Sequence, residues 1–277
     1  MCGRDWSSDV CSSDLPTSSQ LVRTLAVGNF HCYSVAHSSD GQIYVGTSAG
    51  VWLVTGAGPL RTVISSNADV RSLCVSDEII CTSESQNHSP WVTNLHDTNY
   101  QLIHSWEHNP QEWNMPHNVV KMTLRGGSIV ICDRLALTEY SFDGRKKRRM
   151  SYQALNGVPQ SLSAMSQSDD VIVIDSQHQV HRLNVATGRC VWTNGSLAES
   201  AAICCDEADR VFVAVGVSIT VLDSETGEFI RMRQRRYPDR LSSLSLSVSA
   251  EGEVALLSLS VYSSSCFTCN NPYEMFT

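Results

Sequence analysis

The chain has 277 residues, with 20 basic and 28 acidic side chains and a formal net charge of −8. This balance gives no reason to expect bulk affinity for nucleic acid or for a membrane surface. No apolar run approaches the roughly 18 residues needed to span a bilayer, and the length fits one large domain.

The N-terminal segment differs from the rest of the chain. Arg4 to Leu15 resembles the conceptual translation of a short-read sequencing adapter rather than any protein family. We therefore interpret residues 1–15 as an artefact, or alternatively as a Ser- and Asp-rich disordered tail, and exclude them from fold reasoning. Under the first interpretation the natural start is missing, and we expect the remainder to be a fragment of a larger multidomain protein.

A short apolar strand pattern then recurs six times. The copies begin at Ile43, Ile79, Ile129, Val171, Val211 and Val254. Repeats of roughly 40–50 residues that contain several strands each are typical of a β-propeller. We predict that residues 16–277 form an all-β, six-bladed β-propeller of four-stranded antiparallel blades, anchored near those positions.

The clearest repeat runs from Val119 to Tyr152. Residues 120–124 alternate apolar and polar side chains, as a half-buried strand does. Gly126-Gly127 predicts a tight hairpin leading into an apolar strand at 129–132. Asp143-Gly144 predicts a second hairpin before a polar outer strand.

The segment Gln20 to Ala26 reads as an outer strand with no blade before it. We expect it to complete the last blade and close the ring, because closure removes an exposed sheet edge. A seven-bladed ring shortened by truncation is the alternative.

Two repeats suggest a propeller family. The unit Gly127 to Gly144, with Asp133, resembles an NHL-type repeat, and the unit Val171 to Gly188, with Asp175, is similar. The remaining units hold Thr47, Ser83, Val215 and Ser258 at the Asp position. The resemblance implies a propeller like the C-terminal domain of tripartite-motif proteins, which bind protein or RNA. No RING or B-box pattern is present, and no Trp-Asp signature closes the blades.

The longest predicted inter-blade loop carries bulky side chains that suit a partner-binding surface. They are Trp106, His108, Trp113 and His117. Long loops in compact domains often carry function, and exposed tryptophans make good anchors. The alternative is that the tryptophans pack between blades.

Residues twelve positions before the repeat anchors are expected to face a central channel from one side. They include His31, Asn67, His117 and Glu199, with Pro159 and Ser242 completing the set. Imidazole and carboxylate groups can bind metal, which leaves a metal-dependent hydrolase of the lactonase or esterase type as one alternative. Because only Glu199 is acidic, we predict no metal site and no cofactor.

Two basic clusters stand out in this acidic chain. They are Arg145, Lys146, Lys147, Arg148 and Arg149, and Arg231, Arg233, Arg235 and Arg236. Such clusters can contact phosphates, so an RNA-binding propeller is a further alternative. Their place on predicted outer strands favours protection of an exposed edge.

Cysteines at scattered positions are more typical of a reducing compartment than of a disulfide framework, so we expect a cytoplasmic protein. Cys266 and Cys269 have CxxC spacing, but no second pair completes a zinc site. No catalytic motif is present. We therefore expect a non-catalytic platform for protein interaction or substrate recognition, with a protein partner and an unknown oligomeric state.

Overall fold

The structure is a computed structural model in which strands alternate with short turns. It describes residues 23–26, 31–54, 60–85, 91–108, 121–132, 136–151, 157–195, 197, 200–215, 218–234, 244–248, 254–259 and 264–269. Residues 1–15 lie outside these ranges. Within them there are 24 β-strands, and no helix is found there that could cross a membrane.

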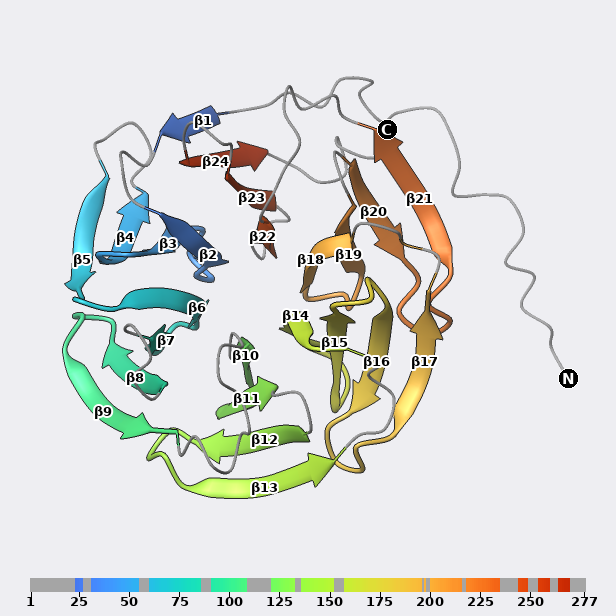
Figure 1. The fold of residues 1–277 in the computed structure, drawn as a ribbon, viewed down its shortest axis with the longest axis horizontal. Helices are drawn as coiled ribbons and strands as arrows, with labels where there is room; N and C mark the ends of the chain where they lie inside the picture. The colour runs from blue at the N-terminus through green and yellow to red at the C-terminus, as the bar shows by residue number, and fades with distance from the viewer. Residues whose placement is uncertain are drawn as a thin grey trace, which may run out of the picture.

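The strands form four-stranded antiparallel sheets arranged as the blades of a propeller (Figure 1). Five sheets each use four strands that follow one another along the chain. The first contains β2 (Cys32–His37), β3 (Ile43–Thr47), β4 (Gly50–Val54) and β5 (Arg61–Ser65). The second contains β6 (Asp69–Val75), β7 (Ile79–Ser85), β8 (Val92–Asp97) and β9 (Leu102–Glu107). The third contains β10 (Lys121–Arg125), β11 (Ser128–Cys132), β12 (Ala136–Ser141) and β13 (Lys146–Ser151).

The remaining sheets complete the ring. The fourth contains β14 (Pro159–Ala164), β15 (Asp170–Asp175), β16 (Val180–Asn184) and β17 (Cys190–Asn194). The fifth contains β18 (Ser200–Cys205), β19 (Val211–Val215), β20 (Ser218–Leu222) and β21 (Phe229–Gln234). A further four-stranded sheet joins β22 (Leu244–Val248), β23 (Val254–Leu259) and β24 (Ser264–Cys269) to β1 (Arg23–Ala26).

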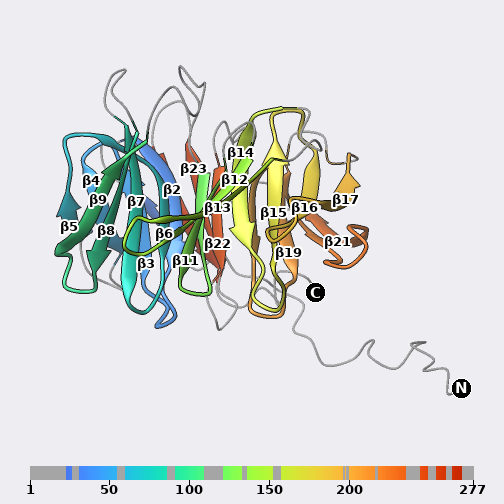
Figure 2. The same cartoon turned by 90° about the horizontal axis from the view of Figure 1, so that it is seen from below.

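Strand β1 closes the ring, as the sequence predicted. It pairs antiparallel with β24, from Arg23 opposite Thr268 to Ala26 opposite Ser265. The innermost strands β2, β6, β10, β14, β18 and β22 follow one another around the axis, and β22 lies beside β2 (Figures 1 and 2). The prediction of an all-β propeller with four-stranded antiparallel blades and an N-terminal closing strand is confirmed.

The repeated apolar segments form the second strand of each blade rather than the strand nearest the axis. Val171 to Ile174 in β15 are completely buried. Ile172 and Ile174 pack in one hydrophobic cluster with Val211 and Val213 of the next blade, while Val171 and Val173 belong to a cluster shared with the preceding blade. Burial on both faces explains why this strand is apolar throughout and why its recurrence is the clearest signal in the sequence.

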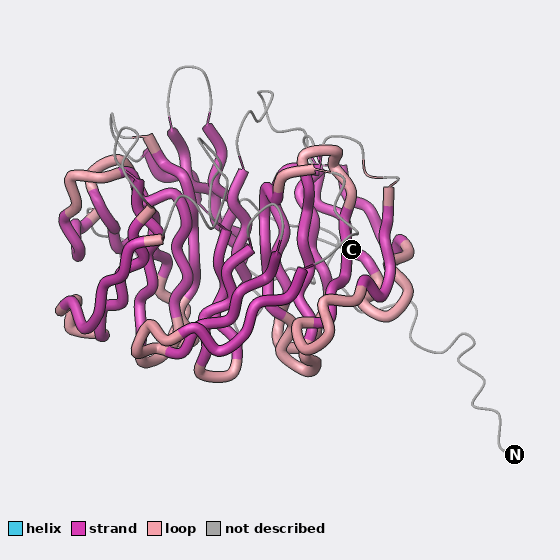
Figure 3. Tube along the Cα trace, turned by 60° about the horizontal axis from the view of Figure 1, so that its bottom comes forward, coloured by secondary structure: helices cyan, strands magenta, loops and turns pink. Residues whose placement is uncertain are grey.

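Glycines in the turns before the outer strands allow adjacent blades to approach closely. Gly144 and Gly227 have φ angles of 77° and 73°, which glycine adopts at little cost. A Cβ atom at Gly227 would lie 2.7 Å from the Trp192 ring of the preceding blade, and one at Gly144 would collide with His104. These predicted turns therefore also set the spacing between the blades, which stand side by side in Figure 3.

Candidate binding channel

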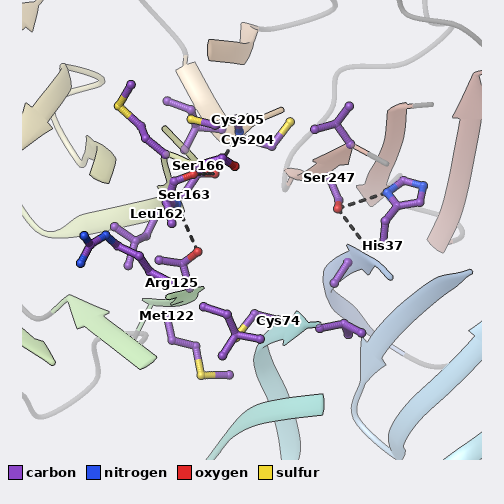
Figure 4. Close-up of a pocket in the computed structure, with 18 of the residues that line it drawn as sticks. His37, Cys74, Met122, Arg125, Leu162, Ser163, Ser166, Cys204, Cys205 and Ser247 are labelled. Atoms are coloured by element: carbon purple, nitrogen blue, oxygen red, sulfur yellow. Dashed lines mark hydrogen bonds between the residues drawn. The ribbon is translucent and has the colours of Figure 1, made fainter. Parts of the chain in front are cut away.

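The innermost strands surround a central cavity of about 860 Å³. Its wall takes residues from all six of these strands and from two adjoining turns: 35–37, 73–75, 122–126, 162–169, 203–205 and 246–248. Figure 4 shows part of this wall. A cavity of this size, lined from many elements, is the best candidate for a binding site in the described part of the chain.

Hydroxyl side chains link neighbouring inner strands around the channel. Ser247 Oγ accepts a hydrogen bond from the backbone N–H of His37 at 3.0 Å and lies 3.2 Å from His37 Nδ1 (Figure 4). Ser163 Oγ accepts from the backbone N–H of Cys205 at 2.9 Å. Further links join the N–H groups of Val35, Met122, Ala164 and Ile203 to the hydroxyls of Ser245, Ser72, Thr123 and Ser161, respectively.

These hydrogen bonds supply partners for backbone groups on the innermost strands of the propeller. The inner edge of each innermost strand has no further strand to pair with, and unpaired backbone groups are costly when buried. A hydroxyl from the preceding blade supplies the missing acceptor to β2, β10, β14 and β18. We call these serine and threonine residues, Ser72, Thr123, Ser161, Ser163, Ser245 and Ser247, the hydroxyl belt.

The belt is interrupted at two junctions in the described part of the chain. Between β2 and β6, Ser34 Oγ is buried without a hydrogen-bond partner among the described residues. Between β18 and β22, Ala202 and Cys204 occupy the register positions that Ser161 and Ser163 hold in β14. The inner edges of β6 and β22 therefore receive no described hydroxyl from the preceding blade.

One mouth of the channel is charged and held in place by contacts between blades. Arg125, at the end of β10, forms an ion pair with Asp169 in the turn after β14. The Asp169 side chain is 65% exposed, whereas that of Arg125 is 16% exposed. Gln167 Nε2 donates to the Glu207 carbonyl of the next blade at 3.0 Å. The solvent-facing carboxylate gives this rim a fixed polar group.

Cations gather near the opposite ends of the inner strands. Arg71 pairs with Asp69, and its guanidinium lies 4.1 Å from the centroid of the Tyr33 ring. Burial, with a smaller effect from the positive charge of Arg71, lowers the pKa of Lys121 to about 8.

The predicted partner-binding loop is divided by the structure. Trp106 lies in β9, where its ring centroid is 5.8 Å from that of Tyr140 in the next blade. His108 is 5% exposed, and its Nε2 lies 2.6 Å from Thr93 Oγ1. These two residues pack between blades instead of standing on an exposed loop. Trp113 and His117 lie outside the described residues, so a binding role for that segment stays a prediction.

The described members of the predicted channel-facing ring do not line this cavity. His31 and Asn67 are exposed and precede β2 and β6, and neither belongs to the lining. His117 and Glu199 lie outside the described residues. Among the residues described, no group of three or more His, Cys, Asp or Glu side chains gathers as a metal site.

The first basic cluster lies on an outer strand, as predicted. Lys146 to Arg149 belong to β13, where Arg148 Nε donates to Glu139 at 2.5 Å and Lys147 Nζ donates to Ser128 Oγ at 2.6 Å. Arg145 pairs with Asp143 in the preceding turn. Part of this charge is thus used within the blade. Arg231 and Arg233 lie in β21, where only the backbone is described, and Arg235 and Arg236 lie outside the described residues.

The hydroxyl belt and the charged rim were not predicted from the sequence. The available signal was the alternation Ser161-x-Ser163 and Ser245-x-Ser247 on strands that precede an apolar strand. Alternating serines are equally typical of a solvent-facing strand. Only the closed ring shows that these faces meet another blade.

Comparison with known proteins supports the fold and nothing finer. No protein-family model matches the chain, and no curated protein matches its sequence. The chain is similar to the WD40 beta propeller domain of Doa1, with TM-score 0.60, 11% identity and coverage of 92% of this chain and 97% of that one. It is also similar to a chain of the mitotic checkpoint complex, with TM-score 0.62, 11% identity and coverage of 98% of both chains. A protein of unknown function from Bacteroides caccae has TM-score 0.59 at 15% identity, over 76% of this chain and 83% of that one.

At such low identity these likenesses show a propeller and no shared activity. None of them supports the NHL-type or tripartite-motif resemblance, which depends on the two repeats quoted above.

Proposed function

We propose that this chain is a non-catalytic, cytoplasmic protein-interaction platform that binds an extended segment of a partner protein in its central channel. The observation that carries the proposal is the interrupted hydroxyl belt. The inner edges of β6 and β22 line a cavity of about 860 Å³ without a described hydroxyl from the preceding blade. An extended peptide can pair its own carbonyl groups with the backbone of an open strand edge.

The Arg125–Asp169 pair at one mouth of the channel would favour one orientation of such a partner. The Asp169 carboxylate faces solvent at the mouth, beside the Arg125 guanidinium. A partner segment with a basic residue next to its channel-bound portion would meet a complementary group there. Charged groups at a rim act mainly on association rate and on specificity.

Two further observations support a platform. One of the similar structures is a chain of the mitotic checkpoint complex. The NHL-like repeats Gly127 to Gly144 and Val171 to Gly188 point the same way, since their family resemblance implies protein or RNA binding. We include the NHL-type assignment and the origin from a larger multidomain protein in this proposal.

The test is a comparison of matched charge-reversal variants in affinity capture from cell lysate. Residues 16–277 are used as the wild type, as Asp169→Arg at the channel mouth, and as Asp143→Arg on the outer rim. Both aspartates are more than half exposed and both pair with an arginine. We expect partners captured by the wild type and by Asp143→Arg to be lost with Asp169→Arg, and to survive nuclease treatment.

Two outcomes would contradict the proposal. Partners retained by Asp169→Arg would place the interface away from this mouth. Partners that vanish with nuclease would instead indicate RNA binding, and neutralising Lys146 and Lys147 would be the next comparison.

A further inference from the structure

Three sulfur-containing side chains lie together at the junction of the second and third blades. They are Cys74 in β6, Cys81 in β7 and Met122 in β10. The Cys81 thiol donates to the Met122 thioether across the junction, with 3.5 Å between Sγ and Sδ. Two elements of one blade and one element of the next thus contribute to the same small volume.

The register of the sheet brings the two thiols together. Cys74 lies directly opposite Cys81 in the β6–β7 pair, and opposite residues of an antiparallel pair place their side chains on the same face. The pKa of the Cys81 thiol is raised well above its ordinary value by burial and further by a hydrogen bond with the Cys74 thiol. The two cysteine side chains therefore lie next to each other on one face of the sheet.

The surroundings are apolar on one side and accessible on the other. Cys81 is completely buried and Met122 is 4% exposed, in a cluster with Ile79, Ile129 and Ile131. Cys74 is only partly buried, and both Cys74 and Met122 line the central cavity (Figure 4). A small ion in the channel therefore approaches this site from the side of Cys74, and apolar side chains bound it on the other side.

We infer that Cys74, Cys81 and Met122 form a binding site for a soft monovalent metal ion of the copper(I) class. Two thiols and a thioether are the soft donor set that selects copper(I). Harder or borderline ions lack donors at this position, because no further His, Cys, Asp or Glu gathers with the two cysteines among the described residues. This inference is independent of the partner-binding function proposed above.

The separation of the Cys81 and Met122 sulfur atoms suits three-coordinate binding. Metal–sulfur bonds of about 2.3 Å in a trigonal plane hold their sulfur atoms about 4 Å apart. The Cys81–Met122 separation of 3.5 Å is close to that value. Modest outward movement of the side chains admits the ion, and methionine tolerates such adjustment because its side chain is flexible.

The binding step involves protons and no electron transfer. One copper(I) ion replaces the two thiol protons, which leave for solvent through the channel, and the thioether adds a neutral donor. The product is a complex with a net charge of −1 at the edge of the cavity. Because thiols must lose their protons to bind, affinity falls as pH falls.

Residue-resolved thiol labelling tests the site. The chain has 11 cysteines, so overall stoichiometry alone does not locate the ion. The reduced protein is labelled with iodoacetamide under anaerobic conditions, with and without copper(I) supplied as its acetonitrile complex, and each cysteine is followed by mass spectrometry. When the free copper(I) concentration is about ten times the dissociation constant, roughly a tenth of the protein remains without the ion. The labelling of Cys74 is therefore expected to fall about tenfold.

The controls separate this site from other thiols. Cys190 lies partly buried on β17 and serves as the internal reference whose labelling stays unchanged. Cys81→Ser removes one donor, and Met122→Leu removes the thioether while nearly conserving volume. Each is expected to abolish or strongly weaken the protection of Cys74. If Cys81→Ser does not fold, Met122→Leu carries the comparison.

Three results would overturn the inference. The first is unprotected Cys74 in the wild type, and the second is unchanged protection of Cys74 in both variants. The third is protection accompanied by loss of two mass units, which would identify a Cys74–Cys81 disulfide in place of a bound ion.

Discussion

His108 occupies a position where a charged imidazole is costly. The side chain is 5% exposed, between Thr93 of its own blade and Tyr140 of the next, at 6.0 Å between ring centroids. Burial lowers the pKa of His108 to about 4. The folded protein therefore holds this imidazole neutral through the range in which an unfolded chain protonates it.

Acidification is expected to destabilise the protein through this residue. The contribution of neutral His108 is fully present above pH 6.5 and is lost as pH falls toward 4, because only the unfolded state gains the proton. Between pH 6.5 and 5 the loss amounts to about 1.5 kcal/mol. Urea unfolding across this range measures it.

The comparison variant is His108→Gln, which does not titrate and should flatten the pH dependence of unfolding free energy. His31→Gln, at an exposed histidine, should leave the wild-type slope intact. Equal slopes for all three proteins would show that other groups govern acid sensitivity. His96 and His181, whose pKa values are also lowered by burial, leave a residual slope in either case.

At the level of strands, the sequence predicts the propeller better than it predicts the position of individual side chains. The second strand of most described blades is rich in apolar residues and buried on both faces, and Asp-Gly or Thr-Gly turns precede the outer strands β13, β17 and β21, so these elements could be predicted from the sequence. The direction of a bulky side chain near a strand end could not be. The sequence alone places Trp106 and His108 in a loop, whereas in the structure both rings contact Tyr140 of the next blade.

The hydroxyl belt makes a prediction at the level of the inner strands. Ser163→Ala removes the acceptor for the backbone N–H of Cys205 and leaves that donor at the channel wall. The expected loss of stability is about 1 kcal/mol, toward the lower end of the range for an unsatisfied donor, because water in the channel offers partial replacement.

Hydrogen exchange locates the effect. The Cys205 amide should exchange faster in Ser163→Ala, with little change in the third blade, and the denaturant midpoint should fall. Ser105→Ala, at an exposed serine of β9, is the matched control and should behave as the wild type. An unchanged Cys205 exchange rate in Ser163→Ala would mean that the hydroxyl does not stabilise this edge.

At the scale of the whole molecule, the ring depends on a four-residue strand from one end of the chain. Arg23 to Ala26 supply the outer strand of a sheet whose other three strands come from residues 244–269. This closure could be predicted from the sequence, because residues 20–26 have an outer-strand pattern with no blade before them. The channel could not be predicted, because the strand faces that line it are defined only when the first and last blades meet.

Removing residues 1–26 should therefore open the propeller at one defined place. The edge of β24 loses its antiparallel partner over four register pairs, from Arg23–Thr268 to Ala26–Ser265. With each net hydrogen bond worth about 1 kcal/mol, the expected loss is about 2–4 kcal/mol. An uncovered strand edge also recruits other chains, so concentration-dependent association should appear. Thermal unfolding and light scattering after size exclusion measure the two effects.

Removal of residues 1–15 alone leaves the strand β1 intact and should change neither the stability nor the association. If both truncated proteins have the same melting temperature and both remain monomeric or both associate, the contacts between neighbouring blades hold the ring closed without β1.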